Sequence, residues 1–485
     1  MIASSLVYLL PELSLSLGGM GLLLYGVFRK QSSVINSMNV AAILLLFGVG
    51  LVLPSSQATV SLFSGQLIND VFGQYLKIGI LIAAVLVMMS TRKALYSDHI
   101  YQTEYPVLIL LSVVGMMLMV SSTGYLSLFM GLELQSLSLY IITALKRDDG
   151  RSSEAAIKYF VLGALSTGLL LYGISLIYGL TGSLLYCDTA KLIAEQQGFS
   201  LSMYVAFAFV LAGIIFKISA VPFHMWTPDV YDGTPTSITT FLATVPKIAA
   251  FGMVIRLLMN PFVEGLANWN IIVAVLAMAS MILGGFAALN QKSIKRLIAY
   301  STIGNAGYSL IGMVSGGQSG VQATIIYVFL YVLATICFFA CLGNLHRRGL
   351  PCEEINDLAG INRIYPGTAF VLAFILFSMA GIPPLAGFLG KLYIFNEAIK
   401  AGQITLAVVG VLASVISAAY YLWIIKVIMM DPIDPDKWQG VETYKRDIAV
   451  TMVIMVIMVT LSLFFIKPNL FIPFASEAAA SLFVK

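Results

Sequence analysis

Apolar residues occur along the whole chain in runs of about twenty, the length that spans a bilayer as an α-helix. Short polar stretches separate the runs. Transmembrane β-strands would instead give alternating segments of about ten residues, and the chain shows no such pattern. The sequence therefore predicts an all-α, polytopic membrane protein.

The runs predict fourteen transmembrane helices. The long apolar stretch from Val107 to Leu145 exceeds one span, and the turn sequence Ser121-Ser122-Thr123-Gly124 divides it. The predicted spans are residues 5–28, 34–54, 74–91, 105–121, 124–145, 156–180, 203–224, 235–258, 270–289, 298–316, 321–345, 367–396, 403–429 and 447–467.

Composition agrees with a membrane location. Hydrophobic residues make up 59% of the chain and charged residues 10%, against roughly 25% charged in soluble domains. The net charge is +4 without a polybasic tail, so a nucleic-acid partner is not expected. The first apolar run lacks a basic leader and a cleavage site, which predicts a retained helix.

Basic residues are concentrated in the connections after spans 1, 3, 5, 9, 11 and 13. These cations are Arg29, Lys30, Arg92, Lys93, Lys146, Arg147, Arg151, Lys292, Lys295, Arg296, Arg347, Arg348, Arg363, Lys437, Lys445 and Arg446. The opposite side has only scattered cations such as Lys77, Lys191, Lys400 and Lys467. Because cytoplasmic connections are enriched in Lys and Arg, we expect both termini on the outer side.

Two predicted spans are interrupted by proline, at Pro222 and at Pro383-Pro384. A membrane helix tolerates such a break where protein or water satisfies the freed backbone groups. The two broken spans are five apart, and an odd offset reverses direction, which indicates an inverted repeat as in many transporters. The predicted units are residues 1–104 (three helices), 105–260 (first repeat), 261–430 (second repeat) and 431–485 (final helix and tail).

Four ionisable residues inside the apolar spans are the candidates for chemistry: Glu133, Lys217, Lys247 and Lys391. A charge at the bilayer centre costs at least about 2.5–3.5 kcal/mol, so such residues are candidates for function by default. The alternatives are a buried ion pair, such as Glu133 with Lys217, or a lysine that snorkels to the interface. Snorkelling explains Lys247 poorly, because this residue lies about halfway along its span.

Buried lysine is suited to proton transfer, since burial disfavours its charged form and a nearby carboxylate favours it. Moving one charge against about 100 mV costs about 2.3 kcal/mol, which a switch between these two environments can supply. His224, just past the first break, is a candidate relay to bulk water; the alternative is a capping or hydrogen-bonded histidine. Glu154 and Lys158, four residues apart, predict a local ion pair.

The chain shows no nucleotide-binding glycine loop and no flavin, haem or iron–sulfur signature. Cys337 and Cys341 lie four residues apart on a predicted membrane helix, where apolar packing explains them better than a metal. We therefore expect no cofactor and no metal in this chain.

At the candidate residues the sequence resembles subunit N of proton-pumping NADH:quinone oxidoreductase, respiratory complex I. The resemblance rests on Val221–Thr236 continuing to Phe241 and Pro246-Lys247, on Ile294–Ile303 with Gly307-Tyr308, on Leu126–Phe129 with Gly131–Leu134, and on Gly381–Pro383 with Gly387–Lys391. It covers nearly the whole chain.

This resemblance implies a fourteen-helix antiporter-like fold with two inverted five-helix repeats. It implies one proton channel, with Glu133, Lys217, Lys247 and Lys391 on a polar axis. It further implies a bacterial inner membrane, neighbouring membrane and peripheral subunits, and NADH, flavin, iron–sulfur clusters and quinone in those partners. The alternatives are a subunit of a cation/proton antiporter and a purely structural membrane scaffold.

Overall fold

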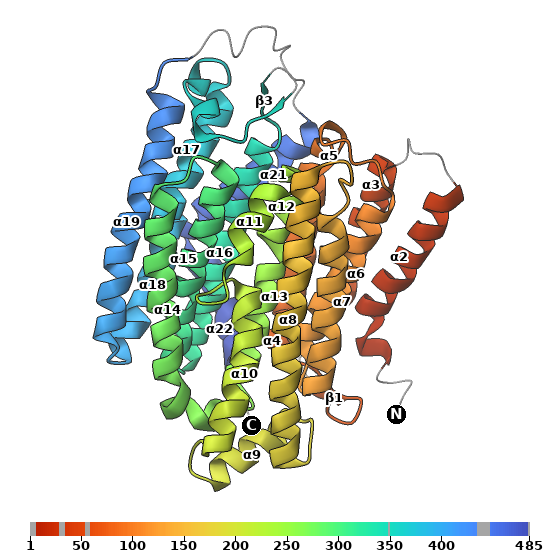
Figure 1. Cartoon of the computed structure of the whole chain (residues 1–485), viewed down its shortest axis with the longest axis vertical. Helices are drawn as coiled ribbons and strands as arrows, with labels where there is room; N and C mark the ends of the chain where they lie inside the picture. The colour runs from red at the N-terminus through yellow and green to blue at the C-terminus, as the bar shows by residue number, and fades with distance from the viewer. Residues whose placement is uncertain (1–5, 29–33, 54–58, 348–349, 434–446, 484–485) are drawn as a thin grey trace.

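A computed structural model describes residues 6–28, 34–53, 59–347, 350–433 and 447–483. Long helices run side by side along the longest axis of the molecule (Figure 1). Across these ranges, twelve helices are long and apolar enough to cross a membrane. The strands form only two short antiparallel hairpins, β1 (Val60–Leu62) with β2 (Leu67–Asn69) and β3 (His346–Arg347) with β4 (Leu350–Pro351).

The first half of the chain supplies eight predicted spans. Its helices are α2 (Leu10–Phe28), α3 (Val34–Val52), α4 (Val71–Thr91), α5 (Ala94–Ser97), α6 (Glu104–Ser121), α7 (Tyr125–Thr143), α8 (Gly150–Thr181), α9 (Tyr186–Glu195), α10 (Leu201–Ile218), α11 (Trp226–Gly233), α12 (Thr236–Leu242) and α13 (Val245–Met259). Polar caps fix several starts: Asp70, Asp149 and Ser200 accept backbone N–H groups at the first turns of α4, α8 and α10.

The second half supplies the remaining spans. Its elements are η2 (Val263–Gly265), α14 (Leu266–Leu289), α15 (Ile294–Val314), α16 (Gln318–Leu342), η3 (Ile355–Leu358), η4 (Ile361–Arg363), α17 (Pro366–Ala380), α18 (Ala386–Lys400), α19 (Ile404–Met429), α21 (Ile448–Ile466), η5 (Pro468–Leu470) and α22 (Ile472–Ser481). Every residue of α13 is buried, whereas α2 and α21 expose many apolar side chains. The centre of the fold thus lies around α13, α15 and α16.

Each of the fourteen predicted spans overlaps a helix or a pair of helices. Twelve meet the length and hydropathy expected of a membrane span, and the other two are α15 and the pair α17–α18. α15 has the length but is less apolar, because it carries Ser301, Thr302, Asn305 and Ser309. The break between α12 and α13 was not predicted.

The two halves repeat one packing order. α6 packs on α7, α8 on α10 and α6 on α13; correspondingly, α14 packs on α15, α16 on α17 and α14 on α19. The close approach of α14 and α15 depends on glycine, because a Cβ at Gly284 would lie 2.5 Å from the Gly304 backbone nitrogen. The boundaries given above for the repeats stay a prediction; the first of them falls after Glu104, the first residue of α6.

Both predicted breaks are present. α10 ends at Ile218 with Ser219 in the left-handed region (φ 64°), and α17 ends at Ala380 with Gly381 at φ 83°. Glycine suits the second position, since a Cβ there would lie 3.0 Å from Lys391 Cδ. Serine at the first position is unusual for this backbone conformation and provides a hydroxyl where a glycine would not.

Most of the predicted basic connections lie at the end of the molecule that carries α5 and β3, opposite α9 and β1 (Figure 1). Arg29, Lys30, Arg348, Lys437, Lys445 and Arg446 lie outside the described residues. Several of the named cations lie in helices and not in the connections between them. Lys77 lies within α4, where its Nζ pairs with Glu12 at 2.6 Å, and Lys295 lies in the first turn of α15, 1% exposed.

Candidate functional site

Lys217 lies in the last turn of α10 and is buried. Its Nζ donates a hydrogen bond of 2.8 Å to Ser136 Oγ on α7 and lies 5.8 Å from the centre of the Tyr140 ring. The ammonium position is therefore fixed between two helices by one hydroxyl and aromatic surface. A single neutral partner leaves this cation poorly compensated, since an ammonium has three donors.

Glu133 is half-buried on α7, one turn before Ser136. Its side chain forms no ion pair with Lys217 within 4 Å in the described part of the chain, so the two do not form the direct pair given as an alternative above. Such spacing allows the carboxylate to influence the lysine without locking its proton in place.

Lys247 lies in the first turn of α13 and points to the break after α10. Its Nζ donates to Ser219 Oγ at 2.6 Å and to the carbonyl oxygen of Lys217 at 3.5 Å. The ring of Trp226 lies 5.3 Å from the same nitrogen. The carboxyl end of a helix carries partial negative charge, so the end of α10 stabilises the ammonium of Lys247.

Lys391, on α18, has the same kind of surroundings at the second break. Its Nζ donates to the carbonyl oxygen of Ala380, the last residue of α17, at 3.0 Å and to Ser414 Oγ on α19 at 2.8 Å. The Tyr308 ring lies 5.0 Å away. Each broken helix thus directs its carboxyl end at a buried lysine.

Two small cavities lie beside Lys247 and Lys391. One is lined by Lys247, the other by Lys391, and both are lined by Asn305 and Tyr331. They leave about 10 and 20 Å³ for the centre of a water-sized sphere, and a water needs roughly 10–15 Å³ on this measure. Each cavity is therefore of the size that one water fills.

Hydroxyl and amide groups surround these cavities. The hydroxyls of Thr302 and Tyr331 are 2.7 Å apart, and Tyr327 donates to Asn305 Oδ1 at 2.5 Å. Asn305 also donates to the Ser301 carbonyl at 2.8 Å. Hydroxyl groups can both donate and accept, so these residues, together with water, can relay a proton between the two lysines.

His224 lies in the turn between α10 and α11 and is half-buried. Its Nδ1 is buried without a hydrogen-bond partner among the described residues. The structure does not join it to Lys217 or Lys247 by a hydrogen bond. Its predicted role as a relay remains a prediction.

A cluster of charged side chains lies next to the first break, on the side that faces the basic end of the molecule. The predicted pair Lys158–Glu154 is present at 2.8 Å, and Lys158 also pairs with Asp229 at 2.9 Å. Asp229 pairs in addition with Arg296 at 3.2 Å, and Asp232 accepts from Ser293 Oγ at 2.5 Å. Asp229 and Asp232 thus hold α11, the segment after the break, against α8 and the start of α15.

Three buried cations were missed as paired groups. Arg256 donates two hydrogen bonds of 2.8 Å to Asp70 and one of 2.7 Å to the Val120 carbonyl. Lys295 pairs with Glu353 at 2.7 Å, and Lys77 pairs with Glu12. The signal available in the sequence was the presence of Glu12 and Arg256 inside apolar runs. The sequence did not show which residues they pair with.

No group of three His, Cys, Asp or Glu side chains in the described ranges is arranged to hold a metal ion. Cys337 and Cys341 are buried, free thiols on α16. We define the polar axis of this structure as Glu133, Lys217, Lys247, Asn305 and Lys391.

Known proteins share both the sequence and the fold. Residues 122–417 match the family described as NADH:quinone oxidoreductase/Mrp antiporter, transmembrane. NADH-quinone oxidoreductase subunit N of Parvibaculum lavamentivorans is 46% identical over 87% of each chain, and that of Paramagnetospirillum magneticum is 42% identical over 99% of this chain and 98% of the relative.

A solved structure of respiratory complex I from Thermus thermophilus with bound aureothin contains a similar chain. It is 30% identical, covers 96% of this chain and 100% of the other, and has a TM-score of 0.82. Identity above 40% across nearly the whole length, together with the family match, settles the assignment. The chain belongs to the family of NADH-quinone oxidoreductase N subunits.

Proposed function

We propose that this chain is a proton-translocating membrane subunit of NADH-quinone oxidoreductase and that protons move along the polar axis. One observation carries the proposal: each of three buried lysines has a serine hydroxyl as partner, and Asn305 and Tyr331 line both the cavity beside Lys247 and the cavity beside Lys391. Buried ionisable groups inside membrane helices mark proton pathways in transporters.

In this account, each lysine alternates between a charged and a neutral form. Ser136, Ser219 and Ser414 hold the three Nζ atoms in place, and a proton leaving one amine travels over hydroxyl groups and intervening water to the next. Glu133 stabilises the loaded form of Lys217. A change at Glu133 or at a neighbouring subunit would then release the proton from Lys217.

The energy for this movement comes from redox chemistry, which we assign to partner subunits. NADH, flavin, iron–sulfur clusters and quinone are therefore expected in other chains. This chain supplies the conduction path and no redox centre. We further propose that it lies in the bacterial inner membrane, with the basic end in the cytoplasm and both termini on the outer side.

The test is proton uptake by the assembled complex in vesicles during NADH oxidation. Replacing Lys217 or Glu133 with alanine is expected to lower proton uptake per electron while assembly is retained. A subunit of a cation/proton antiporter would function without redox partners, so co-purification with redox subunits distinguishes the two. Unchanged proton uptake in assembled variants would favour a structural scaffold.

A further inference from the structure

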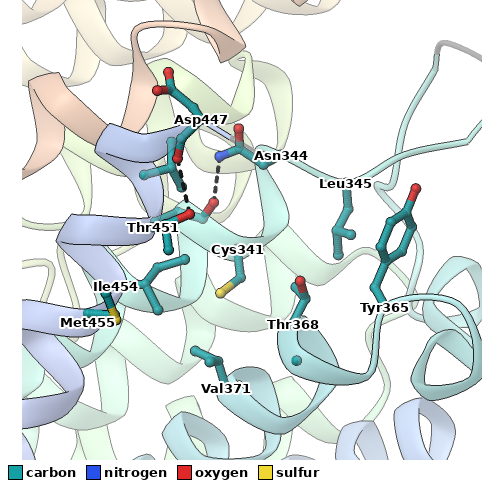
Figure 2. A pocket seen from close by; sticks show the side chains of 13 residues that line it. Cys341, Asn344, Leu345, Tyr365, Thr368, Val371, Asp447, Thr451, Ile454 and Met455 are labelled. Atoms are coloured by element: carbon teal, nitrogen blue, oxygen red, sulfur yellow. Dashed lines mark hydrogen bonds between the residues drawn. The ribbon is translucent and has the colours of Figure 1, made fainter. Parts of the chain in front are cut away.

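A cavity of about 270 Å³ opens at the basic end of the molecule, away from the polar axis. It lies between the end of α16, the start of α17 and the start of α21 (Figure 2). Cys341, Val371 and Ile454 form its apolar part, and Thr368 and Thr451 contribute hydroxyls near the helix ends (Figure 2). None of the residues argued to carry protons takes part in this cavity.

Apolar side chains on and beside the cavity are exposed, as expected of a surface that meets a bilayer. Met455 lines the cavity and is 58% exposed, and Ile448 and Met452 on α21 are also exposed, as is Phe370 on α17. From Asp447 to Met455 the cavity follows α21 for about 12 Å at 1.5 Å per residue. One leaflet contributes about 15 Å of hydrocarbon, so the cavity spans most of a leaflet from its polar surface inward.

Among the residues that the structure describes, two cations lie beside one carboxylate at the polar end of the cavity. Asp447, which lines the cavity, accepts hydrogen bonds from Arg92 at 3.0 and 2.6 Å, and Lys93 Nζ lies 3.9 Å from the same carboxylate. Two cations thus share one carboxylate. Arg92 uses two of its five N–H groups there, and Lys93 remains 38% exposed at its side chain.

We propose that this cavity binds one acyl chain of an anionic phospholipid whose phosphate lies against Arg92 and Lys93. The apolar lining accepts the chain, the hydroxyls of Thr368 and Thr451 lie at the level of the ester groups, and the unbalanced cation attracts the phosphate. Basic pockets between transmembrane helices on the cytoplasmic side are suited to such headgroups. The lipid would fill the space between α17, which carries the second break, and α21.

The test uses the intact complex in nanodiscs that contain phosphatidylglycerol or phosphatidylcholine, each with the same photoreactive diazirine on one acyl chain. Crosslinks are mapped by peptide mass spectrometry. We expect phosphatidylglycerol to label peptides from the start of α17 and from residues 450–455 more strongly than phosphatidylcholine does. Lys93→Gln should weaken this labelling about five-fold, the equivalent of the attraction of one cation near an anionic headgroup.

Lys146→Gln is the matched control, because Lys146 is similarly exposed (34%) and likewise lies 3.9 Å from one carboxylate, that of Asp149. It should leave the labelling unchanged. Thr368→Phe should fill the cavity and remove acyl labelling of α21. If the Thr368→Phe complex does not assemble, the milder Lys93→Gln still decides the test. Equal labelling by both lipids in all variants would show ordinary bilayer contact and overturn the proposal. Absence of labelling at both helices would show that another subunit covers the cavity, and would overturn it as well.

Discussion

Lys247 Nζ donates a hydrogen bond of 2.6 Å to Ser219 Oγ, the residue that ends the first broken helix. The same nitrogen lies 3.5 Å from the carbonyl oxygen of Lys217. The break therefore does more than interrupt α10: it brings a hydroxyl and a freed carbonyl to the lysine of the next span. Through this arrangement two lysines thirty residues apart in sequence become neighbours on one path.

Ser219→Gly tests the hydroxyl without disturbing the backbone, since glycine accepts the positive φ at this position. Loss of a hydrogen bond from a charged donor corresponds to about 1.5–3 kcal/mol. If that loss falls on the transfer step, proton uptake in vesicles should slow about ten-fold or more. Ser175→Ala, at an exposed serine on α8, is the control. A Ser219→Gly complex that takes up protons at the normal rate would show that this hydroxyl has no part in transfer.

Asn305→Leu tests the connection between the two cavities. Asn305 lines both of them, and leucine of similar size removes the polar group while it keeps the space filled. We expect a lower proton uptake per electron with near-normal assembly of the complex. Asn268 lines neither cavity and donates a hydrogen bond to Tyr204. Asn268→Leu is therefore the control and should leave proton uptake unchanged. Equal effects of the two substitutions would contradict a path through Asn305.

The Arg256–Asp70 pair is expected to support stability rather than transport. Both side chains are buried, and removal of one partner from such a pair costs about 3–5 kcal/mol because the other charge stays buried alone. Arg256→Met should therefore lower the thermal midpoint of the complex and the amount assembled. Adding Asp70→Asn should recover part of the loss, since asparagine can still cap α4. Glu154→Gln, in an exposed pair, should change stability by less than about 1 kcal/mol.

The stability of the double variant, compared with that of Arg256→Met alone, shows why the pair matters. If the double variant is no more stable than Arg256→Met alone, the destabilisation arises from lost packing around Arg256 and not from an unpaired carboxylate.

Glu353 gives a pH dependence outside the membrane helices. Burial raises the pKa of its carboxyl, but the attraction and hydrogen bond of Lys295 and the contact with Arg151 outweigh burial, so the pKa lies below its ordinary value. A carboxyl with a lower pKa in the folded state stabilises that state above the unfolded pKa of about 4.3, and the contribution is lost as the pH falls through the folded value.

Glu353→Gln should therefore lower the thermal midpoint at pH 7, and the difference from the unaltered complex should shrink as the pH falls below about 4.3. Thermal unfolding measured from pH 7 down to about pH 3 would show the trend. Glu195→Gln, at an exposed residue of α9, should give no such difference. A Glu353→Gln difference that grows at low pH would mean that the carboxyl is not stabilised by its cationic partners.

Much of this fold follows from the sequence because membrane spans have a length and a composition that are easily read. Proline at 222 and 383 marked both breaks, and the rarity of ionisable residues in apolar runs marked Lys217, Lys247 and Lys391. The partners of Arg256 and Lys77 could not be predicted in the same way. Asp70 and Glu12 lie far from them along the chain, and only the packing of α4, α13 and α2 brings them together.

The role of Asn305 and Tyr331 also depended on structure. A signal was present, since Ser301, Asn305 and Ser309 are spaced by four residues and so share one face of α15. The rotation of α15 and α16 about their axes decides whether that face meets the lysines or the lipid, and the sequence does not determine this rotation. The break between α12 and α13 had no proline in the turn itself to mark it.

The central claim is that the buried lysines conduct protons. The most direct measurement is proton uptake per electron by the assembled complex in sealed vesicles, compared between Lys247→Ala and Lys426→Ala. Lys426 is exposed and pairs with Asp431 at 2.8 Å, so its removal is a matched loss of one lysine from a membrane helix. If the buried lysines conduct protons, fewer protons are taken up per electron by Lys247→Ala, and a normal number by Lys426→Ala. A normal ratio in assembled Lys247→Ala complexes would contradict it.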